Sequence, residues 1–317
     1  MKYYFAPMEG ITGYIYRRSH QRVFPGIDKY FTPFLVPDSN TVFNQREKNE
    51  ILPEHNERMN TVPQILTNRA EDFVRAAKTL EQYGYREINL NLGCPSGTVT
   101  AKKRGSGFLT VPDELDNFFE QVFRQVSIHI SVKTRIGYSS IEEFGRLLEI
   151  YNRYPIYELI IHPRLRQDFY KYPPHMEVFE ATLKESKNPV CYNGDLFHSM
   201  DCEKFKTKFP QIERIMLGRG FLINPGLVKK LKGGEDAKKT EIEKFHAFVY
   251  EGYREIMSGD RNVLFKMKEL WSYLIQSFTE NKKYAKSIRK AANCYEYDIA
   301  VKSLFREQEL LSEVNSK

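Results

Sequence analysis

The segment INLNLGCPSGTVTAKKRGSGF, residues 88–108, begins as a short apolar run, reaches a polar residue at Asn91 and continues into a loop rich in glycine and lysine. Similar runs of apolar and β-branched residues recur along the chain, separated by stretches with helical periodicity. The eight runs are residues 3–6, 29–34, 62–66, 87–92, 129–134, 158–162, 189–193 and 214–217. This alternation is typical of a parallel sheet, either open and doubly wound or closed into a barrel. Eight repeats before residue 235 favour the closed (β/α)8 barrel.

Several of these runs end on a polar residue or a glycine. The fourth to the eighth run deliver Asn91, Lys133, His162, Asn193 and Gly218 in turn. In a barrel of this class, the carboxyl ends of the strands and the loops that follow them build the active site. We therefore expect these five residues to lie at one mouth of the barrel.

The chain changes character after a polar, glycine-containing stretch at residues 232–240. From Glu241 onward it has no proline, and apolar residues return at helical spacing. We place a barrel domain at residues 1–234 and a helical bundle domain at residues 235–317. The tail is nearly neutral, with 15 Lys and Arg against 14 Asp and Glu, but five cations gather at Lys282, Lys283, Lys286, Arg289 and Lys290. They form either a solvated helix surface or a strip that follows phosphates.

Composition indicates the class of protein, the kind of partner and the cellular compartment that we expect. Apolar residues make up 41% of the 317 residues, which is enough for a globular core. The formal charge of +7 suits a polyanionic partner, although many basic proteins bind no nucleic acid. The four cysteines show neither a CxxC pair nor a metal-ligand spacing, so we expect no metal site. No apolar run approaches the ~18 residues of a membrane span, and we expect a cytoplasmic monomer with reduced thiols and no stable protein partner.

The ordered motifs of the barrel resemble those of the FMN-dependent tRNA-dihydrouridine synthase family. The resemblance covers the barrel and extends more loosely into the tail, where KELWSYL at residues 268–274 looks like the family's helical domain. The barrel motifs are APMEGIT at 6–12, Gln64, NLNLGCPS at 89–96, SVKTRIG at 131–137, IHPR at 161–164, YNGD at 192–195 and LGRG at 217–220. Pro163, Leu165 and Thr67, which follows QIL, differ from the residues that are usual in the family. These differences affect loop shape and target position rather than flavin binding.

The resemblance implies a role for each motif. Residues expected to bind FMN are Pro7, Met8, Gln64, Lys133, His162, Asn193, Gly194, Asp195, Gly218 and Arg219. Residues expected to bind the substrate are Asn91, Arg135, Lys102, Arg104 and Arg164. The tail would recognise tRNA, and NADPH would serve as a transient reductant, although no residue separates NADPH from NADH.

These residue types also suit the chemistry on their own terms. The Gln64 amide offers a donor and an acceptor to a pyrimidine edge. A cation at Lys133 would stabilise an anionic reduced flavin, with a structural ion pair as the alternative. His162 is either a flavin contact or a satisfied core histidine. Glycines and Arg219 after the last two strands suit a phosphate, at the position where such barrels commonly bind one.

Cys94 lies between a glycine and a proline, in a turn that suits a thiol meeting a substrate, although a free cysteine is more often a small buried hydrophobe. The resemblance implies hydride transfer from FMN to C6 of an unstacked uridine and protonation of C5 by the Cys94 thiol. Two alternatives stay open: an FMN barrel oxidoreductase that acts on a small molecule, and an RNA-binding protein that has lost catalysis. The sequence leaves open which uridine is modified, and whether ribosomal RNA is a substrate.

Overall fold

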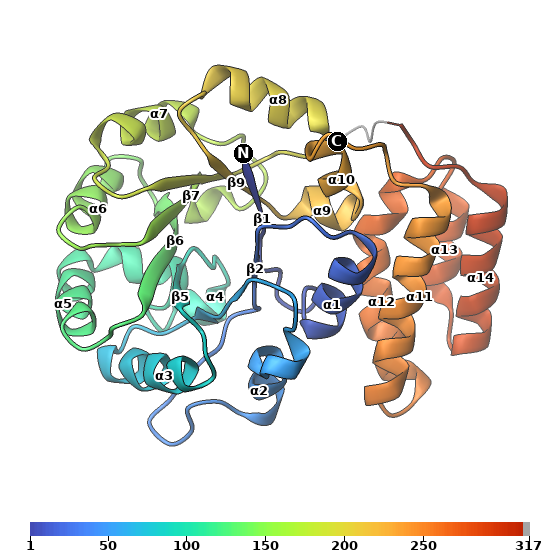
Figure 1. Cartoon of the computed structure of the whole chain (residues 1–317), viewed down its shortest axis with the longest axis horizontal. Helices are drawn as coiled ribbons and strands as arrows, with labels where there is room; N and C mark the ends of the chain where they lie inside the picture. Colours follow the sequence, from blue (N-terminus) through green and yellow to red (C-terminus); the bar gives the residue numbers. More distant parts are fainter. Residues whose placement is uncertain (313–317) are drawn as a thin grey trace. The chain divides into compact units, whose positions relative to one another are not determined.

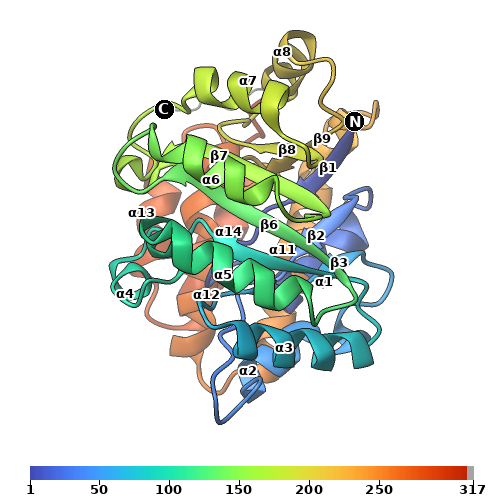
Figure 2. The same ribbon diagram turned by 90° about the vertical axis from the view of Figure 1, so that its left-hand side faces the viewer.

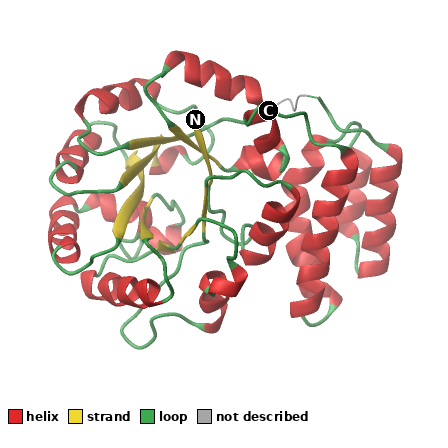
Figure 3. Ribbon diagram, in the orientation of Figure 1, coloured by secondary structure: helices red, strands yellow, loops and turns green. Residues whose placement is uncertain are grey.

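Residues 1–312 are described by the computed structural model, in which nine strand segments form one sheet. Figures 1 and 3 show this sheet and the helices around it. Their order across the sheet is β3-β2-β1-β9-β8-β7-β6-β5-β4. The pairings from β4 to β9 are parallel, as is that of β2 with β3. The strands are β1 (Lys2–Phe5), β2 (Lys29–Phe31), β3 (Thr61–Val62), β4 (Gln64–Ile65), β5 (Glu87–Leu92), β6 (His129–Gly137), β7 (Glu158–Leu165), β8 (Val190–Asn193) and β9 (Arg214–Leu217).

The third expected strand is divided at Pro63 into β3 and β4. Proline has no N–H to donate, although its carbonyl accepts a hydrogen bond of 2.8 Å from the Asn89 N–H. The two halves are successive in the chain, yet they stand at opposite ends of the strand order, and a bridge between Leu35 and Ile65 links the chain after β2 to β4. The sheet therefore closes on itself, and the predicted parallel barrel is confirmed, with nine segments in place of eight runs.

The chain packs as two compact units. The first comprises Met1–Tyr4, Lys29–Asp195 and Gln211–Met216, and the second Phe5–Asp28, Leu196–Pro210 and Leu217–Lys317. In the first unit, helices lie along the outer face of the sheet (Figure 2). They are α2 (Gln45–Ile51), α3 (Ala70–Gln82), α5 (Pro112–Phe123), α6 (Glu143–Tyr151) and α7 (Met176–Glu185), with the short α4 (Gly97–Thr100) after β5. The domain boundary expected near residue 234 stays a prediction.

The second unit contains the helical tail that the sequence predicted (Figure 3). The tail forms α11 (Lys239–Ile256), α12 (Asp260–Leu274), α13 (Lys282–Lys290) and α14 (Cys294–Glu307). The same unit also contains α1 (Tyr14–Val23), α8 (Ser199–Lys208), α9 (Arg219–Ile223) and α10 (Leu227–Leu231). Within residues 1–312, none of the helices combines the length and the apolar character needed to cross a membrane.

A buried polar contact joins three helices of the tail. The Trp271 indole N–H of α12 donates to the Tyr297 hydroxyl of α14 at 2.7 Å, and that hydroxyl lies 2.6 Å from Nε2 of His246 in α11. Because the hydroxyl has a single hydrogen, it donates to His246 while accepting from Trp271. Burial lowers the pKa of His246 to about 3, so the imidazole is neutral and can accept this bond.

A cluster of charges fills the amino-terminal ends of the barrel strands. The Lys29 ammonium lies 2.7 Å from Glu87 and 3.3 Å from Glu158, and Arg214 lies 3.3 Å from the other oxygen of Glu158. The Tyr4 hydroxyl donates to Glu158 at 2.9 Å. The Glu158 side chain is only 3% exposed, so removing it would leave two cations buried without their shared partner.

We predict that Glu158→Ala lowers the free energy of unfolding by about 3–5 kcal/mol, the usual cost of removing one partner from a buried ion pair. Urea denaturation followed by circular dichroism measures the effect. Arg124→Ala is the matched control, because Arg124 and Glu120 pair on the surface with side chains 73% and 50% exposed. Equal unfolding midpoints for the two variants would show that the cluster does not stabilise the barrel.

Candidate active site

Cys94 lies in a turn that is fixed by the last residues of β5. The Asn91 side-chain oxygen accepts hydrogen bonds from the backbone N–H groups of both Gly93 and Cys94, each at 3.0 Å. Asn91 is buried, whereas Cys94 is partly exposed and forms no disulfide. One amide therefore fixes the backbone of the turn and leaves the thiol at the end of the strand.

The chain then folds back onto the same turn. The Cys94 carbonyl accepts from the Ser106 N–H at 3.1 Å and from the Ser106 hydroxyl at 2.8 Å. Gly105 has φ +56°, and a Cβ there would lie 2.9 Å from the Cys94 Cβ. Only glycine combines this left-handed backbone with so close an approach. Gly105 thus allows the loop to pack against the turn.

A row of amide and hydroxyl groups crosses the strands next to this turn. The Asn91 amide donates to Gln64 at 2.7 Å, Gln64 donates to Asn89 at 2.8 Å, and Asn89 donates to Ser131 at 2.9 Å. Residues two apart on a strand share a face, which explains why Asn89 and Asn91 both reach Gln64 on β4. Gln64 and Asn91, both expected from the sequence, are therefore in direct contact.

Lys133 on β6 is paired in register with Asn91. Burial, followed by the positive charge of Arg135, lowers the pKa of Lys133 to about 8. No carboxylate among residues 1–312 is found among the charges that act on Lys133, which excludes the structural ion pair for the described part of the chain. The side chain is a half-buried cation that an anionic group would stabilise.

Two buried arginines fix the loop that follows β7. Arg135 donates to the Gly93 carbonyl at 2.9 Å and to the Leu165 carbonyl at 2.7 Å, and Arg164 donates to the Tyr172 carbonyl at 2.6 Å. Each residue is only 1% exposed. Both guanidinium groups therefore hold backbone in place, and the substrate contacts expected of them stay predictions.

His162 and Asp195 meet at Arg164. The guanidinium donates to His162 Nε2 at 3.0 Å and to Asp195 Oδ1 at 2.8 Å, and a second bond joins it to Asp195 Oδ2. Because guanidinium only donates, Nε2 must be the acceptor, which places the proton of the neutral ring on Nδ1. Arg135 and His162 are also neighbours in register. The arginine thus sets the tautomer of the histidine.

The other expected residues of this unit lie around the same strand ends. Asn193 at the end of β8 is buried and donates to the Met216 carbonyl at 2.8 Å, and Gly194 follows it. A Cβ at Gly194 would lie 2.0 Å from the Tyr192 hydroxyl, so this position requires glycine. Lys102 is exposed and Arg104 is partly exposed in the loop after α4.

The second unit holds the remaining four expected residues. Pro7 and Met8 follow β1, and the Met8 N–H and carbonyl both hydrogen-bond with Thr12, which closes a turn. A Cβ at Gly218 would lie 3.6 Å from the Met8 sulfur, so Met8 and Gly218 adjoin. The Arg219 guanidinium lies 4.9 Å above the ring of Phe197.

Sequence reasoning missed two groups of residues. Asn89 and Ser131 complete the amide row, and the polar alternation in INLNL was the available signal for Asn89. Three exposed aromatic residues, Phe169, Tyr170 and Tyr172, lie in the loop after β7, shortly after the IHPR motif. Their concentration within four residues was visible in the sequence, but their exposure was not.

Comparison with known proteins identifies relatives that share one family. The family model for dihydrouridine synthase (Dus) matches residues 4–313. A probable tRNA-dihydrouridine synthase of Staphylococcus epidermidis is 28% identical over 258 residues, covering 78% of this chain and 77% of that protein. tRNA-dihydrouridine synthase B of Pasteurella multocida is 26% identical, covering 72% of this chain and 68% of that protein.

Solved structures share the fold at low identity. A 2-naphthoyl-CoA reductase has a TM-score of 0.58 at 10% identity, covering 74% of this chain and 50% of that one. The old yellow enzyme of Trypanosoma cruzi has a TM-score of 0.53 at 8% identity, covering 81% of this chain and 94% of that one. The structures support the barrel alone, whereas the family model spans nearly the whole sequence, and the chain belongs to the dihydrouridine synthase family.

Proposed function

We propose that this chain reduces uridine in tRNA to dihydrouridine, using a flavin cofactor and an NAD(P)H-type reductant. The observation that carries the proposal is the Cys94 turn, in which the Asn91 amide, itself paired in register with Lys133, holds the backbone of a partly exposed cysteine. Reduction of the C5–C6 double bond needs a hydride at C6 and a proton at C5. A bound flavin would supply the hydride, so the chain's own residues must supply the proton.

Cys94 is the group that we assign to proton delivery. Its backbone N–H and carbonyl are both hydrogen-bonded within the turn, so the direction of its Cα–Cβ bond is fixed. An amide nitrogen carries two hydrogens, and Asn91 gives one to Gln64, which leaves one for a uracil carbonyl. Asn91 would thus orient the base and the thiol together, which lowers the entropic cost of reaching the reactive geometry.

Lys133 provides the test of whether the site suits a flavin. A half-buried ammonium with a lowered pKa, and with no carboxylate of residues 1–312 acting on it, is satisfied by an anionic ring edge. We identify the cofactor as FMN, with Gln64, Lys133 and His162 in contact with its ring. Pro7 and Met8 would border the ring, and the phosphate would bind through Asn193, Gly194, Asp195, Gly218 and Arg219.

We assign RNA recognition to the helical tail, on the evidence of helix α13. Its five cations are all exposed, and three of them, Lys282, Lys286 and Arg289, line a groove of about 520 Å³ between α12 and α13. Lys268 also lines this groove, and no carboxylate of the described residues does. A cationic groove with an apolar floor suits the phosphates and sugars of RNA.

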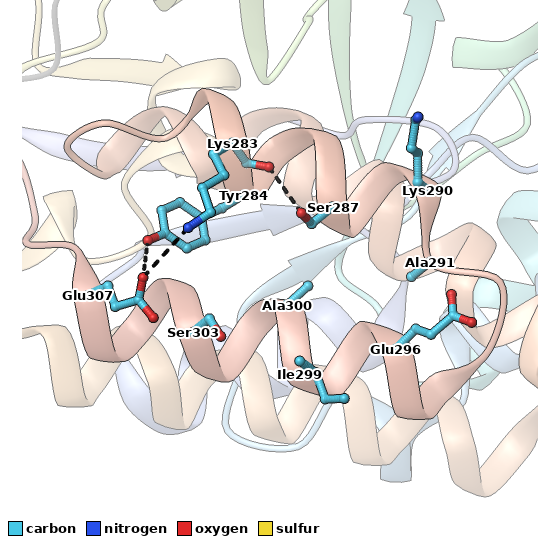
Figure 4. A pocket seen from close by; sticks show the side chains of 10 residues that line it. All are labelled: Lys283, Tyr284, Ser287, Lys290, Ala291, Glu296, Ile299, Ala300, Ser303 and Glu307. Atoms are coloured by element: carbon cyan, nitrogen blue, oxygen red, sulfur yellow. Dashed lines mark hydrogen bonds and ion pairs between the residues drawn. The ribbon is translucent and has the colours of Figure 1, made fainter.

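The opposite side of α13 has a different charge (Figure 4). There Lys283 and Lys290 share a groove of about 320 Å³ with Glu296 and Glu307 of α14. Tyr284 donates to Glu307 at 2.6 Å, and Lys283 lies 4.0 Å from the same carboxylate. Because these acids offset the cations, the phosphate-binding side of the helix is the one that faces α12.

We predict that Cys94→Ala slows the reoxidation of NADPH-reduced flavin by unmodified tRNA by about 10²–10⁴-fold, the usual contribution of a general acid. Stopped-flow absorbance of the flavin measures the rate. Cys294→Ala is the matched control, because Cys294 is also a partly exposed cysteine that forms no disulfide but lies in α14. Reoxidation of the Cys94→Ala enzyme at the wild-type rate would remove Cys94 from the mechanism.

We predict that FMN affinity falls as the pH rises past about 8, because the Lys133 ammonium then loses the proton that makes it cationic. Lys133→Arg keeps its charge and should bind FMN with little change across this range, whereas Lys133→Met should bind weakly at every pH. Quenching of flavin fluorescence gives the dissociation constants. An unchanged pH profile in Lys133→Met would contradict the assignment.

We predict that replacing Lys282, Lys286 and Arg289 together by alanine weakens tRNA binding. The slope of log affinity against log salt should fall by about 0.9 for each phosphate that is no longer neutralised. The double variant Lys283→Ala, Lys290→Ala is the control on the opposite side of the same helix. Fluorescence anisotropy with labelled tRNA at several salt concentrations measures both quantities. Equal losses of affinity in the two variants would refute the preference for the α12 side.

A further inference from the structure

The loop between β7 and α7 presents large aromatic side chains to solvent. Phe169, Tyr170 and Tyr172 are 41%, 48% and 59% exposed. Most aromatic residues of this unit are buried in the core, including Tyr4, Phe31, Phe73 and Tyr151. Exposed aromatics concentrated within four residues mark a binding surface more often than they mark packing.

The loop backbone is held firmly from beneath. Arg164 donates to the Tyr172 carbonyl at 2.6 Å, and Arg135 lies 3.4 Å from the Phe169 carbonyl. Asp168 accepts from the Leu165 N–H at 2.7 Å and lies 3.1 Å from His175 Nε2. These contacts come from buried or half-buried side chains, so the aromatic rings project from a rigid base.

Phe169 has a strained backbone, with φ +48°. A bulky residue seldom adopts a left-handed conformation, and such strain persists where the surroundings impose it, often at functional sites. The Arg166 guanidinium lies 5.2 Å from the rings of both Phe169 and Tyr138, and Arg135 lies 5.9 Å from Tyr170. Of these two cations Arg166 is partly exposed and Arg135 is buried, while the acidic residue of the loop, Asp168, is already engaged.

We propose that Phe169 and Tyr172 form a stacking surface for unpaired RNA bases next to the target uridine. The inference rests on the proposed function and names further residues that position its substrate. Aromatic faces stack on any base, and neighbouring cations attract the phosphates between bases, which is how proteins bind single-stranded nucleic acid. The surface lies in the loop that follows β7, the strand that carries His162 and Arg164, and Arg164 contacts that loop, so the surface adjoins the candidate active site.

Tyr172→Ala tests the stacking directly, because Tyr172 is the most exposed of the three rings and its removal leaves the backbone contact with Arg164 intact. We expect affinity for unmodified tRNA to fall by roughly tenfold, with the salt slope unchanged because the number of neutralised phosphates stays the same. Tyr172→Phe keeps the ring and should bind like the wild type. Fluorescence anisotropy of the full chain with labelled tRNA transcript gives both quantities.

Tyr157→Ala is the matched control. Tyr157 is 43% exposed but precedes β7, at the opposite end of the strand from the loop. The proposal is overturned if Tyr172→Ala binds tRNA as tightly as Tyr157→Ala does. The exposed aromatic loop would then be a surface for a protein partner and not for RNA. It is also overturned if Tyr172→Phe loses as much affinity as Tyr172→Ala, because the hydroxyl would then matter rather than the ring.

Turnover separates this inference from the proposed function. If the wild type forms dihydrouridine, Tyr172→Ala should raise the KM for tRNA by about the same roughly tenfold factor and leave kcat nearly unchanged, because the ring positions RNA without taking part in proton transfer. If the wild type forms none, the proposed function fails, and the anisotropy comparison still decides whether the loop binds unpaired bases.

Discussion

The hydrogen bonds from Asn91 to the backbone of Gly93 and Cys94 are the constraint on which the rest of the site depends. Asn91 is held by the register of β5 between β4 and β6, and its amide nitrogen is engaged with Gln64. The pairing of the strands in the closed sheet therefore sets the position of the Cys94 turn. A thiol that must deliver a proton to one carbon atom gains from a support that does not move.

Arg135 and Arg164 extend the same principle to the loop after β7. Both begin on strands, both are almost fully buried, and both donate to carbonyls of that loop, Arg135 to Phe169 and Arg164 to Tyr172. Arg164 also fixes His162 through the imidazole nitrogen that accepts its hydrogen bond. The two arginines, which the sequence suggested as substrate-binding cations, thus connect the barrel strands to the aromatic loop after β7. Lys133 remains as the half-buried cation of the strand ends on which no carboxylate of residues 1–312 acts.

Much of the barrel was predictable because its strands are short apolar runs that end on polar residues. The division at Pro63 was harder to foresee, since a proline within a run shows where pairing is interrupted but not which neighbour each half joins. Burial of Arg135 and Arg164 was not predictable, because it depends on carbonyls some 30 residues away along the chain or in a later loop. Likewise, the five cations of α13 look alike in the sequence, and only packing against α12 and α14 distinguishes its two sides.

The central claim is that Cys94, fixed by Asn91, completes the reduction of uridine in tRNA. Mass spectrometry of nucleosides from unmodified tRNA, incubated with FMN-loaded protein and NADPH and mapped by position, tests it most directly. The account predicts that loop uridine gains the mass of two hydrogens with the wild type and that this gain is largely lost in Cys94→Ala. A flavin that NADPH reduces, together with tRNA that gains no mass at any uridine, would contradict it.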